Sequence, residues 1–128
     1  MTLTRDSKHS LVLGSFLLGL AVMIGAFGAH GLKNLVEPRL LETFETGVRY
    51  HFYHGFGLLF LGLLQAMIPT LKTKVSTFAF VVGILLFSFN CYFYVISGTK
   101  IFAMIVPLGG VLFILGWMNL SWQLLRLR

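Results

Sequence analysis

Acidic residues are scarce in this chain: it has four among 128 residues, beside ten lysines and arginines. They are Asp6, Glu37, Glu42 and Glu45, and none lies within a long apolar segment. Hydrolases that use paired carboxylates, and carriers that move protons through a buried carboxylate, therefore have no candidate residues here. No recognised catalytic motif is present either, so we expect no enzyme activity.

Cysteine and surface charge are also rare. The single cysteine, Cys91, excludes an internal disulfide and is interpreted as a small packing residue. Charged residues make up 11% of the chain and hydrophobic residues 57%, with a mean hydropathy of +0.88, which leaves too little polar surface for a water-soluble domain. The net charge of +6 is scattered without forming a basic face, so we expect membrane lipid as a partner and no nucleic acid.

Long apolar segments fill most of the sequence and predict an all-α fold, an integral membrane four-helix bundle that forms one domain over residues 1–128. The expected spans are about 10–29, 51–69, 76–97 and 101–122, because a helix rises about 1.5 Å per residue and the hydrocarbon layer is roughly 30 Å thick. The first segment is longer than the apolar run of a signal peptide, so we expect it to be retained.

Between the first two spans, residues 38–50 predict an amphipathic helix that rests on the extracytoplasmic interface. Leu40, Phe44 and Val48 share one face at about 100° per residue, and Glu45 and Arg49 share another. Because no proline lies between Pro38 and Pro69, a single helix of about thirty residues is an open alternative, which would project or bend at a glycine.

Basic residues are divided unevenly between the two predicted sides of the membrane. Six lie on the side of the termini and four on the other: Arg5, Lys8, Lys72, Lys74, Arg126 and Arg128, against Lys33, Arg39, Arg49 and Lys100. Because positive loops stay inside, both termini are expected in the cytoplasm.

Three histidines, His30, His51 and His54, are predicted at one interface, where they could bind a metal ion. His51 and His54 are spaced i,i+3, and His30 follows the first span, which would supply three imidazole ligands. Glu45 points about 180° away from His54 on a continuous helix, so it is not a fourth ligand. The alternative is that these rings are ordinary interface residues, as aromatic and histidine side chains often are.

Polar residues inside the third span are the second candidate site. Asn90 is expected to bond another helix, with solute contact as the alternative, and Tyr50 and Arg49 are further candidates for contact with a ligand or solute. In the last span, Pro107 and the pair Gly109-Gly110 predict a kink or a late start of the helix.

Small residues recur on one side of the first span, at Gly14, Ala21, Gly25 and Gly28. This pattern predicts close helix packing within the chain or between copies of it, so a homo-oligomer or another membrane protein partner is expected.

Three strings carry a resemblance to a known family: Gly25 to Leu32 (GAFGAHGL), Tyr50 to His54, and Pro107 to Trp117. The chain resembles the bacterial family called domain of unknown function 423, and animal transmembrane protein 256 is similar. The resemblance covers nearly the whole chain and implies a four-span protein of the bacterial plasma (inner) membrane without an established activity. The chain differs at Phe89-Asn90-Cys91, where the family usually has small residues, and at Val106, where it often has threonine.

Three functions are thus predicted. The first is a small channel, transporter or solute-binding membrane protein, which requires a polar path from Asn90 to the histidines. The alternative is an interaction, scaffold or lipid-binding subunit, which requires an exposed docking face. A metal-binding protein that uses the three histidines is the lesser alternative, and the cofactor is otherwise unknown.

Overall fold

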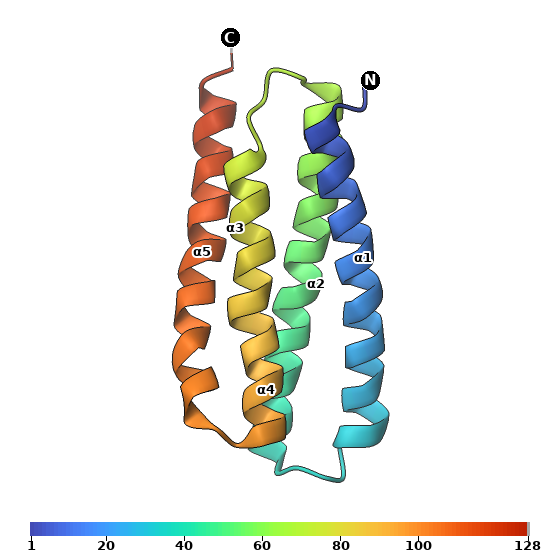
Figure 1. Cartoon of the computed structure of the whole chain (residues 1–128), viewed down its shortest axis with the longest axis vertical. Coiled ribbons are helices and arrows are strands. Elements are labelled where there is room, and N and C mark those ends of the chain that lie inside the picture. The colour runs from blue at the N-terminus through green and yellow to red at the C-terminus, as the bar shows by residue number, and fades with distance from the viewer. Residues whose placement is uncertain (128) are drawn as a thin grey trace.

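A computed structural model describes residues 1–127 and contains helices but no strand in that part of the chain. In chain order the elements are α1 (Arg5–Phe27), η1 (Gly28–Leu32), α2 (Pro38–Met67), α3 (Lys74–Ile84), η2 (Leu85–Phe89), α4 (Asn90–Ser97) and α5 (Lys100–Leu125), where η1 and η2 are π-helical turns. They form four antiparallel rods, because η1 extends α1, and η2 joins α3 to α4 (Figure 1). The predicted all-helical membrane bundle is confirmed.

Local sequence signals account for several helix boundaries. Thr4 caps α1 by accepting a hydrogen bond from the backbone nitrogen of Ser7 at 3.1 Å. Pro38 occupies the first turn of α2, where its missing N–H has no helical partner to lose. Gly98 ends α4 with a φ of 68°, a conformation that glycine adopts without a steric penalty.

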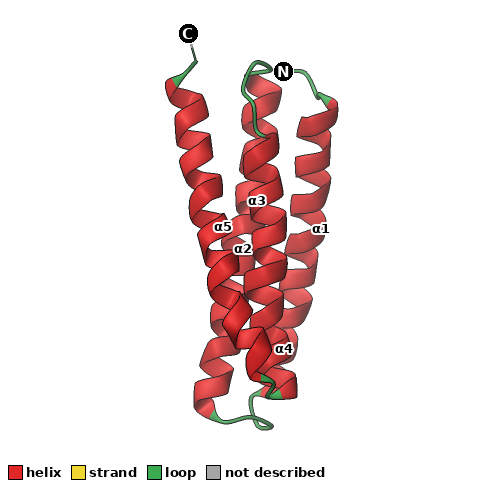
Figure 2. Cartoon of the chain, turned by 60° about the vertical axis from the view of Figure 1, so that its left-hand side comes forward, coloured by secondary structure: helices red, strands yellow, loops and turns green. Residues whose placement is uncertain are grey.

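The four rods pack in an open arrangement. α1 packs mainly along α2, and α5 packs on α3, η2 and α4, so that α2 and the α3–α4 rod form the central pair (Figures 1 and 2). Buried apolar side chains fill the space between the central pair and its neighbours, among them Leu58, Leu61, Phe80 and Ile84. A second cluster around Phe44, Tyr92 and Val95 fills the end near the α1–α2 turn.

Three helical segments are long and apolar enough to cross a membrane: Arg5–Leu32, Lys74–Ser97 and Lys100–Leu125. They correspond to the first, third and fourth predicted spans. α2 is not among the three, although it has 30 residues, because histidine, tyrosine and charged residues lower its apolar character. It also has more buried residues than α1 or α5, and its polar side chains His51, His54 and Gln65 are among them. That α2 crosses the membrane, as the second predicted span, stays a prediction.

Two expectations about helix ends differ from the structure. Residues 38–50 are not a separate interfacial helix; they form the first turns of α2, which continues past Gly55 and Gly57. The segment runs along the bundle because Phe44 packs in the core against Tyr92, with ring centroids 5.0 Å apart. For the last helix, the sequence left a kink or a late start open; the late start is wrong, since α5 begins at Lys100 and continues through Pro107, and the kink stays a prediction.

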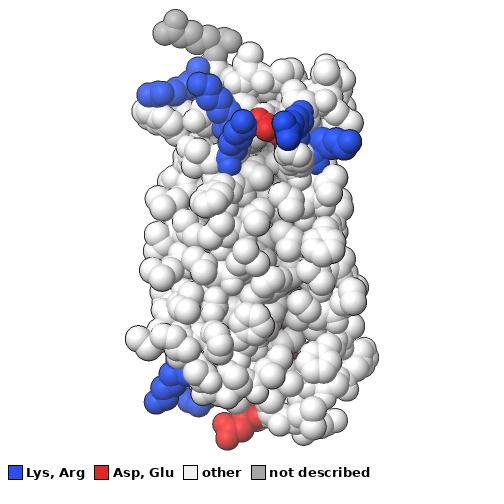
Figure 3. All heavy atoms as spheres, in the orientation of Figure 1, with Lys and Arg blue, Asp and Glu red and all other residues white. Residues whose placement is uncertain are grey.

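Charged side chains on the face shown in Figure 3 gather at the two ends of the bundle. The end that carries both termini has the basic residues Arg5, Lys8, Lys72, Lys74 and Arg126 with the single acid Asp6. Arg128, the sixth basic residue of that predicted side, lies outside the described residues. This distribution matches two head-group layers separated by an apolar band.

Candidate functional site

His54 lies near the middle of α2 and uses both of its ring nitrogens. Nδ1 pairs with the carbonyl oxygen of Tyr50 at 2.8 Å, and the indole N–H of Trp117 donates to Nε2 at 3.1 Å. A carbonyl only accepts, so the proton is on Nδ1 and the Nε2 lone pair is occupied by Trp117. The ring also stacks on Phe113, with centroids 3.5 Å apart. His54 therefore joins α2 to α5 and has no lone pair left for a metal.

The other two histidines lie elsewhere. His51 is fully buried and its Nδ1 pairs with the hydroxyl of Tyr92 at 3.0 Å, whereas His30 is exposed in η1 at the end of the bundle. In the part of the chain that the structure describes, no three histidine, cysteine or acidic side chains are grouped to hold a metal. The three histidines do not form one layer, because α2 begins at Pro38 and carries His51 about 20 Å along its axis, into the bundle.

Asn90 bonds within its own rod, so the expected bond to another helix is wrong. Its amide nitrogen donates to the carbonyl oxygens of Leu85 and Leu86, at 3.1 and 3.0 Å. Both carbonyls belong to η2, where the wider π-helical turn disrupts the regular i to i+4 pattern. The side chain thus bonds to the backbone of the π-helical turn, which is a structural role that its sequence position did not reveal.

Tyr50 and Arg49 point to different surroundings. The ring of Tyr50 lies against Phe87, with centroids 4.6 Å apart, and Arg49 donates to the hydroxyl of Thr46 at 3.0 Å on an exposed face. Among the contacts of the described residues, none joins Tyr50, Arg49 and Asn90 into one site. Tyr50 and His54 do line a lateral cleft of about 580 Å³ between α2 and α5, whose other walls are mainly aromatic and aliphatic.

The small residues of α1 serve packing within the chain. A side chain at Gly14 would meet the carbonyl oxygen of Gly55 at 3.0 Å, and one at Gly28 would overlap the ring of Phe44. Ala21 is fully buried on the same side. The predicted close approach of helices is confirmed for α1 and α2, and these residues are not an exposed face for another copy.

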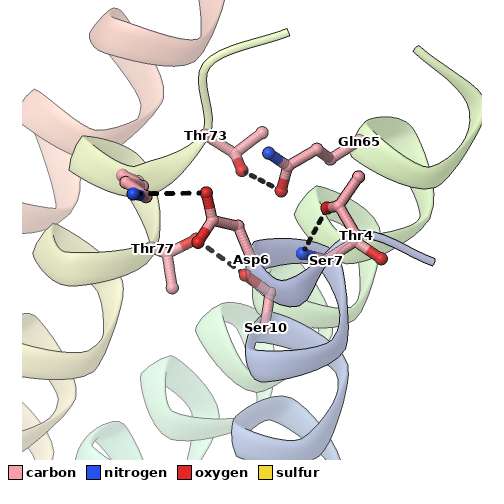
Figure 4. A network of polar contacts seen from close by, with 8 residues as sticks. Thr4, Asp6, Ser7, Ser10, Gln65, Thr73 and Thr77 are labelled. Atoms are coloured by element: carbon pink, nitrogen blue, oxygen red, sulfur yellow. Dashed lines mark hydrogen bonds and ion pairs between the residues drawn. The ribbon is translucent and has the colours of Figure 1, made fainter. Parts of the chain in front are cut away.

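Sequence reasoning missed a polar network at the end that carries both termini (Figure 4). It joins three helical rods: the hydroxyls of Ser10 and Thr77 lie 2.9 Å apart, and Thr73 donates to Gln65 at 2.8 Å. Lys74 Nζ lies 3.5 Å from a carboxylate oxygen of Asp6. The partners are 67 residues apart for Ser10 and Thr77, so only the expectation that both helices begin on one side of the membrane hinted at them.

A groove of about 370 Å³ opens beside this network, between α1 and α3. Its mouth is polar and its floor is apolar. The mouth is formed by Asp6, His9, Ser10, Lys74 and Thr77, and the wall nearer the middle of the bundle by Leu13, Phe78 and Val81. Leu13 and Val81 lie about 10 Å below Asp6 and Lys74 by the helical rise. The groove remains open because α1 packs chiefly on α2 and contacts α3 little.

Fold and sequence relatives together define the class, a multi-pass bacterial membrane protein. The chain belongs to the family described as "Protein of unknown function (DUF423)", whose model matches residues 24–110. This confirms the resemblance carried by the glycine-rich string and the Pro107 region.

Relatives named as UPF0382 membrane proteins match over most of both chains. One from Staphylococcus epidermidis is 36% identical over 113 residues, which is 88% of this chain and 92% of the relative. YwdK of Bacillus subtilis is 38% identical over 111 residues, 86% and 90% of the two chains. One from Haemophilus influenzae is 34% identical over 101 residues, 79% and 81% of the two chains. No solved structure matches.

Proposed function

We propose that the protein is a non-catalytic membrane protein that binds one phospholipid from the side, in the groove between α1 and α3. The observation that carries this proposal is the lining of the groove, which changes from charged and hydroxyl groups at the basic end to Leu13, Phe78 and Val81 below. A phospholipid has the same order of groups, a charged head followed by acyl chains. Its head would lie at the level of Lys74, where a membrane surface is expected.

The interior of the bundle favours lateral binding over the predicted solute path. Leu58, Leu61 and Phe80 have no exposed surface and lie in the core between the rods. Three of the side chains expected to line a path bond to the protein: His54 to Trp117, His51 through Nδ1 to Tyr92, and Asn90 to its own backbone. A conducting path would need polar groups facing a water-filled space, which these contacts do not support.

The same proposal includes the membrane topology. All four rods cross the bacterial inner membrane, and both termini are in the cytoplasm. The antiparallel course of α2 alongside α1 supports the fourth crossing, because an apolar α1 and an apolar α3–α4 rod enclose it (Figure 1). The basic residues around Lys74 and Arg126 support the orientation.

Photocrosslinking in intact membranes tests the site. A phospholipid with a diazirine in its acyl chain should label Leu13, Phe78 and Val81 more strongly than Leu115 and Met118. The latter are 54% and 59% exposed on α5, line neither the groove nor the lateral cleft, and report contact with bulk lipid. Equal labelling of the two sets of residues would show that the groove holds no resident lipid.

A further inference from the structure

The mouth of the α1–α3 groove carries charges of both signs. Asp6 and Lys74 form an ion pair at 3.5 Å, and their side chains are 34% and 77% exposed. An ion pair this exposed contributes little to stability, because water already solvates both groups. Either group can therefore exchange its partner for a ligand of opposite charge without a large loss of stability.

Because the groove is proposed to hold a phospholipid, its charges also indicate which head group fits. We propose that the site selects a head group that carries a phosphate and a primary ammonium together, as phosphatidylethanolamine does. The phosphate pairs with Lys74, and the ammonium pairs with Asp6. One zwitterionic head group thus satisfies both members of the ion pair that it separates.

Asp6 decides against an anionic head group. It is the single acidic residue at the end of the bundle that carries the termini, and it lines the groove itself. An anionic phospholipid such as phosphatidylglycerol would pair its phosphate with Lys74 and leave the Asp6 carboxylate without a cation at the same mouth. The Asp6 carboxylate and a lipid phosphate in the same groove repel each other, so the carboxylate lowers affinity for anionic phospholipids.

Hydrogen bonding at the mouth favours a primary ammonium over a quaternary one. A primary ammonium has three N–H donors, and the mouth has acceptors in the Asp6 carboxylate and the hydroxyls of Ser10 and Thr77. Those hydroxyls lie 2.9 Å from each other, and Ser10 is buried whereas Thr77 is half-buried, so Thr77 is the one of the two that a bound ammonium can reach. The choline head group of phosphatidylcholine has no donors, so it forfeits the short charge-assisted bonds that Asp6 offers.

The polar and apolar residues of the groove follow one another along the helix axes in the same order as the head group and acyl chains of a phospholipid. Asp6 and Lys74 lie in the first turns of α1 and α3, and Leu13 and Val81 are each about two turns deeper. The volume of about 370 Å³ holds a head group and the first part of a chain, while the rest of the lipid lies along the exposed surface of α1 and α3. The pocket therefore recognises the head group more than chain length.

The test is a binding titration of delipidated full-length protein with three phospholipids that have identical acyl chains. We expect phosphatidylethanolamine to bind about tenfold more tightly than phosphatidylcholine or phosphatidylglycerol, the scale of one charge-assisted hydrogen bond. Asp6→Asn should remove the preference over phosphatidylcholine and strengthen phosphatidylglycerol binding. Asp6→Glu keeps the carboxylate and should retain part of the preference. Glu45→Gln, at an exposed position on α2 away from the groove, is the matched control.

The possible results of this titration distinguish the head-group assignment from the proposed lipid binding itself. Equal affinities for the three lipids, or a preference that survives Asp6→Asn, would overturn the head-group assignment and leave lipid binding in the groove intact. If none of the three lipids binds the folded wild-type protein, the proposed function fails, and the head-group assignment fails with it. A preference that disappears in Asp6→Asn and persists in Glu45→Gln supports both.

Discussion

Trp117 and His54 lie 3.1 Å apart between the indole nitrogen and Nε2, and this hydrogen bond connects α5 to α2 inside an apolar bundle. Phe113, one turn earlier on α5, stacks on the imidazole with an interplanar angle of 6°. The sequence presented His54 as a candidate metal ligand, whereas its contacts hold two helices together.

Replacing Trp117 with phenylalanine should lower the stability of the fold. The change keeps an aromatic ring but removes the donor, so Nε2 of His54 is left without its partner in an apolar interior, at a cost of about 1–3 kcal/mol. Thermal denaturation in a mild detergent measures the effect. Trp122→Phe is the control, because Trp122 is 52% exposed. Equal melting temperatures for the two variants would show that the hydrogen bond contributes nothing.

Gly109 is a position where the last helix lies close to the backbone of the π-helical turn η2. A side chain there would overlap the backbone nitrogen and Cβ of Phe87, so Gly109→Ala must separate α5 from η2. We expect a loss of about 1–3 kcal/mol, the usual cost of overpacking a core. Gly19→Ala is the matched control on α1, since nothing lies within 4 Å of a side chain there. If both variants unfold at the same temperature, the close approach does not exist in solution.

Asn90→Ala tests whether Asn90 is structural. Its amide supplies donors to the carbonyls of Leu85 and Leu86, so the variant should lose about 1 kcal/mol of stability and show faster amide exchange around η2. Phospholipid binding should not change, because Asn90 does not line the α1–α3 groove. Asn34→Ala, in the exposed turn after η1, provides the control. If the variant keeps its stability but loses phospholipid binding, Asn90 contacts a ligand and is not structural.

Elemental analysis of purified protein tests the remaining metal hypothesis. His54 has no ring nitrogen to offer and His30 lies apart from His51, so we expect metal well below one equivalent. The alanine variants at the three positions should give the same low value. Near-stoichiometric metal that disappears in His51→Ala would contradict this geometry, because His51 is the buried histidine whose Nε2 lacks a hydrogen-bond partner among the described residues.

Apolar segment length was sufficient to predict the three rods formed by α1, by α3 with α4, and by α5, since hydrocarbon thickness fixes how many residues a span needs. It failed for the segment before His51. There, apolar residues on one helical face and charged residues on another looked like a helix on a membrane surface, but Phe44 packs against apolar partners in the bundle and α2 stays continuous.

The site was harder to predict than the fold because its residues are distant in sequence. Asp6 and Lys74 each looked like an ordinary charge flanking a span, and only the antiparallel packing brings them within 3.5 Å. Asn90 was misread for a different reason: the π-helical turn that it satisfies has no signal in the composition of Leu85–Phe89.

Native mass spectrometry of protein released from its own membranes tests the central claim, a single phospholipid held between α1 and α3. The informative pair is Leu13→Trp, which fills the groove, and Val12→Trp, which adds the same bulk at a neighbouring position that is 58% exposed and outside the groove. The account predicts one bound phospholipid in the wild type and in Val12→Trp, and loss of that lipid in Leu13→Trp. A wild-type protein without bound lipid, or equal retention in both variants, would contradict it.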